Sequence, residues 1–111
     1  LAHLGRHTLE QNGGSGVVGY MSSEFGTEPA KLQVWLSPAA GRTNYPLYNF
    51  DNRSLHEVTI DQLMSAGVQL ENITVDNRDT TLESGLFSHS EFLKGNRASD
   101  GRQAVVCMMK P

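Results

Sequence analysis

The chain has 111 residues, of which 38% are hydrophobic, and a net charge of −3 from 9 basic and 12 acidic residues. This length is enough for one small domain with a thin core. The near-balance of charge and the scattered basic residues argue against nucleic acid or an acidic membrane surface as a partner. No apolar run approaches the roughly 20 residues of a membrane-spanning helix. We therefore expect one domain over residues 1–111 that binds neither nucleic acid nor membrane.

The single cysteine, Cys107, excludes an internal disulfide. Such cysteine usage is typical of a reducing compartment, which predicts a cytoplasmic protein. Cys107 lies within an apolar stretch, where a buried thiol has a raised pKa and is inert. We expect it to be a core residue and not a nucleophile.

The chain opens on Leu1–Leu4, which has the pattern of the end of a strand already in progress. Two interpretations are open: a trimmed chain with a complete fold, or the later part of a longer fold. An open strand edge at Leu1 predicts self-association into a homo-oligomer, or a missing N-terminal half. After His3, the residues around Gly5 favour a strand-to-loop exit over a helix that would bring His3 and His7 onto one face.

The rest of the chain shows the periodicities of short helices and strands. In chain order we predict a helix from about Gly16 to Phe25 stopped by Gly26, a strand over Leu32–Leu36, a short edge strand over Tyr45–Phe50, a helix over Leu55–Ala66 with a capping box of Ser54 and Glu57, a strand over Glu71–Val75, and a buried strand over Gln103–Met109. The predicted fold class is α/β or α+β, with a mixed sheet of about four or five short strands and two helices.

The strand over Leu32–Leu36 is followed by Ser37-Pro38 and then by the small-residue loop Ala39–Gly41. Pro38 ends the strand because proline has no N–H for a sheet ladder. The loop lacks side-chain bulk, so its backbone can come close to a ligand or to a neighbouring strand. The pattern fits a binding site and a tight core equally well.

Several stretches of the sequence resemble the motifs of a known family, and they occur in the same order as in that family. They are Ala2–Gly5 (AH-x-G), Phe25–Pro38 (FG-x-x-P-x-x-L-x-x-W), Gln62–Val68 with Glu71–Ile73 (QLL-x-AGV-x-x-ENI), Leu86–His89 (FFS-[HY]) and Asp100–Ala104 (TGR-x-A). On these motifs the chain resembles the laccase-domain family, also called the YfiH-like or multicopper polyphenol oxidase family, whose members are described as purine nucleoside phosphorylases. The matched stretches span nearly the whole chain and correspond to the C-terminal part of a typical member.

The resemblance implies zinc-dependent phosphorolysis of inosine or adenosine, with purine nucleoside and phosphate as ligands. It makes His3 the histidine of AH-x-G and therefore a zinc ligand, with a further His and Cys expected upstream of Leu1. A catalytic zinc has three protein ligands and one open position. Arg102, in the TGR motif, and Arg42, after the Ala39–Gly41 loop, are predicted to bind substrate, because a guanidinium suits phosphate.

A second interpretation is that the chain is a degenerate relative of this family and acts as a structural or binding module. Thr43-Asn44 stand where the family has paired cysteines, and Ser90-Glu91 where it has an arginine pair. Arg102 also has a structural alternative, an ion pair with Asp100 that holds the loop.

Other candidate residues are weaker. His7 and His89 could complete a metal site only if the fold brings them close to His3. Ser88 and His89 would face opposite sides of a strand and so form no nucleophile–base pair. His56 is expected to lie on the exposed part of its helix. Lys94 and Arg97 are weaker candidates than Arg102 for binding an anion.

Overall fold

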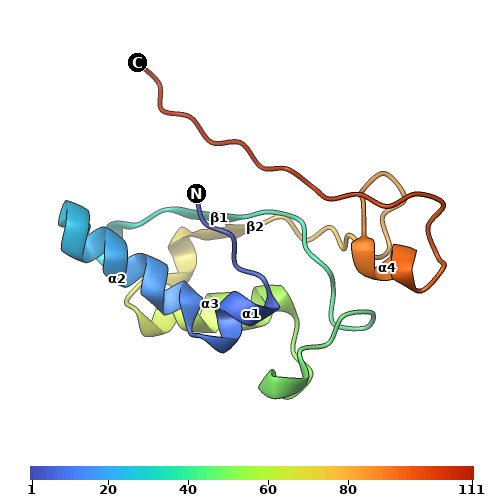
Figure 1. Cartoon of the computed structure of the whole chain (residues 1–111). Coiled ribbons are helices and arrows are strands. Elements are labelled where there is room, and N and C mark those ends of the chain that lie inside the picture. Colours follow the sequence, from blue (N-terminus) through green and yellow to red (C-terminus); the bar gives the residue numbers. More distant parts are fainter.

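The computed structural model describes all 111 residues and contains four α-helices and one sheet of two short parallel strands (Figure 1). The helices are α1 (Arg6–Glu10), α2 (Gly13–Phe25), α3 (Leu55–Ser65) and α4 (His89–Leu93), and the strands are β1 (Val34–Leu36) and β2 (Ile73–Val75). Three short 3-10 turns lie at Pro29–Lys31, Tyr48–Phe50 and Leu70–Asn72. Judged by length and apolar character, none of the helices could cross a membrane.

The sequence predicts the two longer helices, including the start of α3 and the end of α2, but α2 begins at Gly13 and not at about Gly16. At the start of α3 the Ser54 side chain accepts a hydrogen bond from the Glu57 N–H, and the Glu57 carboxylate accepts one from the Ser54 N–H. This reciprocal pair is the predicted capping box. Helix α2 ends at Gly26, whose φ of +65° is left-handed and therefore favours glycine.

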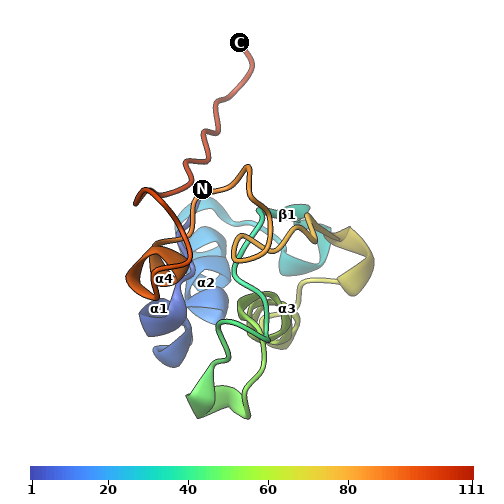
Figure 2. The same ribbon diagram turned by 90° about the vertical axis from the view of Figure 1, so that its right-hand side faces the viewer.

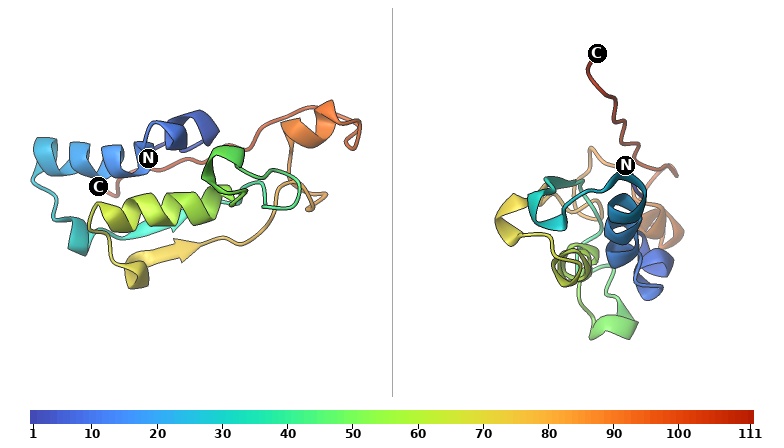
Figure 3. Two further views of the ribbon diagram at one scale, coloured as in Figure 1. Left: turned by 90° about the horizontal axis from the view of Figure 1, so that it is seen from below. Right: turned by 90° about the vertical axis from the view of Figure 1, so that its left-hand side faces the viewer.

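Strands β1 and β2 run parallel, with Val34 opposite Ile73 and Leu36 opposite Val75. The segment between them includes α3, which lies against the same face of the sheet as α2 (Figure 3). Because the strands are parallel, their carboxyl ends lie at the same edge. A further bridge between Ala39 and Asp79 continues the pairing beyond that edge.

The core consists of two small clusters. The first is centred on Leu9, Leu47 and Val58, and the second on Val18, Leu63 and Val68. The second cluster fills the space between the sheet and helices α2 and α3. These six side chains are the only buried hydrophobic ones, so the core is thin.

The Gln62 side chain joins the three N-terminal helices. Its Oε1 accepts a hydrogen bond from the Gly14 N–H at 2.9 Å, and its Nε2 donates to the Leu9 carbonyl at 2.8 Å. The Ser15 hydroxyl donates to the Gln62 carbonyl at 2.8 Å. A Cβ at Gly14 would come within 2.7 Å of the Gln62 Cβ, so glycine permits this close approach of α2 to α3.

The predicted sheet of four or five strands is wrong: the structure has two. Tyr45–Phe50 does not form an edge strand. The Leu47 N–H bonds to the Arg53 carbonyl, and Asp51 and Asn52 both have left-handed φ, so the segment closes on itself as a turn. Leu47 still enters the core as the pattern required, but on a bend and not on a strand.

The predicted buried strand over Gln103–Met109 is also wrong. This segment has no regular structure, and Val106 and Met109 are largely exposed. It runs away from the folded part of the chain (Figures 1 and 2). Cys107 is therefore exposed and not a core residue. An apolar run forms a buried strand only where a neighbouring strand supplies hydrogen bonds, and here β1 pairs with β2 alone.

Two short helices replace segments predicted as non-helical. Helix α1 begins one residue after Gly5, where a strand-to-loop exit was expected. Helix α4 begins after Ser88, whose hydroxyl accepts a hydrogen bond from the Glu91 N–H at 3.3 Å. Each is only five residues long, too short for a periodic pattern to be visible in the sequence.

A substitution in the second core cluster should lower the free energy of unfolding far more than a substitution at an exposed neighbouring residue. Replacing Leu63, which is 3% exposed, by alanine should lower the free energy of unfolding by about 2–5 kcal/mol, because it leaves a cavity between α3 and the sheet. The neighbouring Met64, 44% exposed, is the matched control, and its change to alanine should cost less than about 1 kcal/mol. Urea unfolding of the two variants measures both; equal losses would contradict the assigned core.

Candidate functional site at the carboxyl ends of the strands

A cavity of about 310 Å³ lies beyond the carboxyl ends of β1 and β2 and against the first two turns of α3. It is lined by Ala39–Arg42 after β1, by Ser54, His56, Glu57 and Ile60 from α3 and its cap, and by Val75 and Asn77–Asp79 at the end of β2. Ligands of open α/β folds bind at this edge, where loops follow the strands. The cavity is therefore the candidate site.

Asp79 fixes the loop after β2 against the loop after β1. Its Oδ1 accepts hydrogen bonds from the Thr81 N–H at 2.8 Å and the Thr81 hydroxyl at 2.6 Å, and the backbone N–H of Gly41 also bonds to the carboxylate. The Thr80 N–H donates to the Ala39 carbonyl at 3.0 Å. A Cβ on Gly41 would overlap the Asp79 carboxylate, so the small-residue loop makes its close approach to the chain that follows β2.

The pKa of Asp79 lies below its usual value. Burial alone would raise that pKa, but the hydrogen bonds from Thr81 and from the Gly41 N–H favour the ionised form and outweigh burial. Asp79 is thus an ionised carboxylate that already accepts hydrogen bonds from the protein. It holds together the two loops that form this wall of the cavity.

Arg42 lines the cavity as predicted from its position after the small-residue loop. Its Nε donates to the Asn52 carbonyl at 3.1 Å, and its Nη1 lies 3.9 Å from the Glu57 carboxylate, a loose contact. Glu57 is itself occupied by the capping box, and the hydrogen bond from the Ser54 N–H is the main reason that its pKa is lowered. The terminal N–H groups of Arg42 therefore remain available to a ligand.

Arg78 is a second arginine at the cavity, which the sequence did not single out. It binds Asp76 in a fork, with Nε to Oδ1 at 2.9 Å and Nη2 to Oδ2 at 2.7 Å. The side-chain hydrogen bond from Arg78 lowers the pKa of Asp76. This pair leaves Nη1 of Arg78 without a carboxylate partner.

His56 is half-buried and lines the cavity, so the expectation of an exposed surface histidine is wrong. Its Nε2 lies 2.8 Å from the carbonyl oxygen of Ser37, the residue that follows β1. The contact arises because α3 packs on the sheet face with its first turn over the end of β1. Spacing along the helix could not reveal this, since the partner is a backbone atom 19 residues earlier.

His3, the predicted zinc ligand, is exposed in the segment before α1. His7 pairs loosely with Glu10 at 3.8 Å, and His89 with Asp100 at 2.9 Å. No three His, Cys, Asp or Glu side chains of the chain are grouped as a metal site would need. The residues present do not by themselves form a zinc site.

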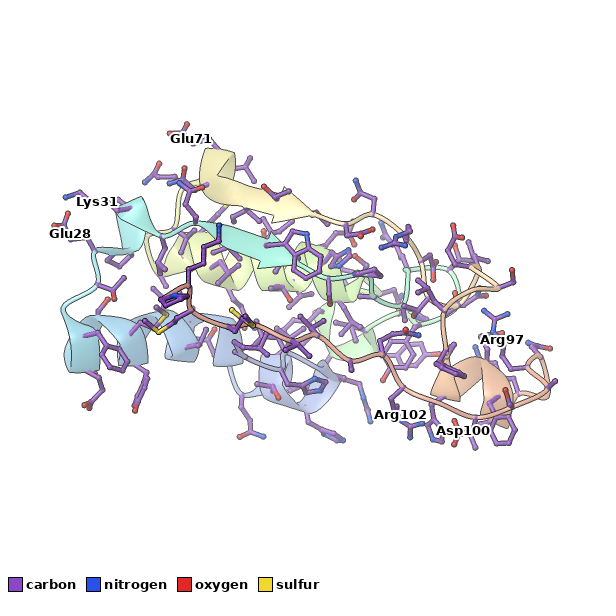
Figure 4. The ribbon with its side chains drawn as sticks, turned by 90° about the horizontal axis from the view of Figure 1, so that it is seen from above. Glu28, Lys31, Glu71, Arg97, Asp100 and Arg102 are labelled. Atoms are coloured by element: carbon purple, nitrogen blue, oxygen red, sulfur yellow. The ribbon has the colours of Figure 1, made fainter.

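Arg102 lies with Asp100 at the α4 end of the molecule (Figure 4). Its Nη1 is 3.0 Å from Asp100 Oδ1, which also accepts hydrogen bonds from His89 Nδ1 and the Gly101 N–H. The hydrogen bond from His89 is the main cause of the lowered pKa of Asp100. Arg102 is not among the residues that line the cavity; its ion pair with Asp100 lies within the loop, and the contact of Asp100 with His89 holds that loop to α4.

A further charged cluster surrounds Glu91, which is buried at 5% exposure. Asn96 donates to its Oε2 at 2.7 Å and Lys94 Nζ to its Oε1 at 3.0 Å, and these two bonds lower the pKa of Glu91. Arg97 donates to the Thr80 carbonyl at 3.1 Å. Lys94 and Arg97 thus serve to hold α4 and its loop.

Comparison with models of protein families, with curated proteins and with solved structures found no significant match for this chain.

Asp79 makes the stability of the fold sensitive to acid. Because its pKa is lowered in the folded chain, its carboxylate stabilises the fold above the unfolded pKa of 3.8, and this contribution is lost as the pH falls from there to the folded pKa. Asp79→Asn keeps an acceptor for Thr81 but loses the charge, and should cost about 1–3 kcal/mol near neutral pH.

Urea unfolding between about pH 7 and pH 2 measures this difference. The stabilities of wild type and Asp79→Asn should converge as the pH drops below 3.8. The exposed Glu24→Gln change is the control and should leave the curve unaltered. If the difference in free energy of unfolding between wild type and Asp79→Asn does not vary with pH, the pKa of Asp79 is not lowered in the folded chain.

Proposed function

We propose that this chain binds a purine nucleoside and phosphate in the 310 Å³ cavity and carries out phosphorolysis, the activity implied by its resemblance to the laccase-domain family. The observation that carries the proposal is the position of Arg42, at a cavity beyond the carboxyl ends of two parallel strands. The cavity is within the size range of small-ligand sites, about 300–1,000 Å³.

The chemistry of phosphorolysis suits the groups at this cavity. A phosphate oxygen attacks C1′ of the ribose, the C1′–N9 bond breaks, and its electron pair leaves with the purine. The nucleophile is an anion, so it needs a cation to hold it, and a guanidinium binds phosphate through two parallel N–H bonds. Arg42 has terminal N–H groups to offer, because its nearest carboxylate, on Glu57, is 3.9 Å away.

Replacing Arg42 by alanine should raise the KM for phosphate and lower kcat/KM by about 10–100-fold, the effect of losing a hydrogen bond to a charged group. Release of free base from inosine or adenosine, measured with and without phosphate, provides the assay. Lys31→Ala is the control, since Lys31 pairs with Glu28 at the opposite end of the molecule from Arg102 (Figure 4). Arg102→Ala tests the other predicted substrate-binding arginine.

Two results would count against this proposal. Phosphate-independent release of base, or none at all from the wild-type chain, would exclude phosphorolysis. Full activity in Arg42→Ala would exclude Arg42 as the phosphate-binding side chain.

His3 is the only residue of the chain that we propose as a zinc ligand. Since the described residues group no further ligands with His3, the others would have to come from a second copy or another segment. We expect purified protein to contain zinc, and His3→Ala to lose it, while His7→Ala retains it. Metal content per chain by mass spectrometry measures this. Equal zinc in His3→Ala and wild type would show that His3 is not a ligand.

The second candidate function is a binding module without turnover. It is favoured by Arg102, which is paired with Asp100, a carboxylate that His89 also binds. Ligand binding at the cavity with no release of base would support this alternative. Self-association and a cytoplasmic location are proposals that rest on the sequence.

A further inference from the structure

His56 has a fixed pattern of donor and acceptor nitrogens. Its Nε2 is 2.8 Å from the Ser37 carbonyl oxygen, which can only accept a hydrogen bond. The proton of the neutral ring is therefore on Nε2. Nδ1 is left as an unprotonated nitrogen, and it takes part in no hydrogen bond within the chain. Such a nitrogen is able to accept a proton or a hydrogen bond from a ligand.

His56 and Arg42 line the same cavity from two different elements. His56 comes from the first turn of α3, and Arg42 from the loop after β1. A guanidinium that holds an anion and a neutral imidazole beside it are the two groups that deprotonation of a bound acid requires. No other histidine lines this cavity.

The remaining charged groups around His56 come from α3 and from the two loops that follow the strands. They are Glu57 on α3, Arg42 after β1, and Asp76, Arg78 and Asp79 after β2. Each carboxylate among them is held by its own donors, so none is paired with the imidazole.

We infer that His56 is the general base of the reaction, an inference that rests on the proposed function. Nδ1 accepts the proton of hydrogen phosphate as the phosphate oxygen forms its bond to C1′. The C1′–N9 bond breaks, and its electron pair goes to the purine. The imidazolium then returns the proton to a purine nitrogen, so that ribose 1-phosphate and free purine leave and His56 is neutral again.

His56→Gln tests this role without removing the structural contact. The glutamine side-chain amide can donate to the Ser37 carbonyl, but it has no basic nitrogen. We expect kcat to fall by about 100–10,000-fold, the range for loss of a general base. The melting temperature and the KM for phosphate should be unchanged, whereas Arg42→Ala should raise that KM. The exposed His7→Gln is the control and should behave as wild type.

Two measurements separate this inference from the proposed function. An active wild type whose acid-side loss of rate disappears in His56→Gln supports the inference. An active wild type with unchanged kcat in His56→Gln overturns the inference alone, whereas an inactive wild type overturns both. Nitrogen NMR of the imidazole ring reports the tautomer directly, and a proton on Nδ1 in place of Nε2 overturns the inference whatever the activity.

Discussion

The parallel pairing of β1 with β2 is the constraint on which the rest of the structure depends. It joins two segments nearly 40 residues apart, with Trp35 opposite Thr74 at its centre. Because the strands are parallel, the two loops that follow them emerge at one edge. The Ala39–Asp79 bridge and the contact of Asp79 with Gly41 extend the pairing into those loops. The cavity exists because these loops and the start of α3 meet there.

Helices α2 and α3 stabilise this small sheet from one face only. The strands contribute Val34, Leu36 and Ile73 to the cluster around Val18 and Leu63, while Trp35 on the opposite face is more than half exposed. Helix α3 has two roles: its apolar side covers the sheet, and its first turn supplies His56 and Glu57 to the cavity. The same packing that forms the core therefore places the side chains of the site.

Local signals in the sequence predicted the two longer helices, α2 and α3, but not α1, α4 or the sheet. Ser54 with Glu57 and the glycine at position 26 act within a few residues, so the ends of α3 and α2 could be located. Strands depend on distant partners, and nothing local shows whether a partner is present. This is why the apolar run at 103–109 was mistaken for a buried strand.

The candidate site was predictable in part. The small-residue loop and Arg42 were identified from their position after a strand, and both lie at the cavity. His56, Arg78 and Asp79 were not, because their roles arise from contacts with the backbone or with the loop after the other strand. Arg102 and Asp100 lie on the loop that follows α4, and Asp100 also binds His89 at the start of α4. The sequence motif did not distinguish this local contact from a substrate site.

We expect ligands to bind where the loops after β1 and β2 meet. Mapping of backbone amide shifts during titration with inorganic phosphate, and then with inosine, tests it most directly. Binding there should give saturable shifts concentrated at residues 39–42, 54–57 and 77–79, at the cavity. Shifts concentrated instead around Arg102 and α4, or no shifts with either compound, would contradict it.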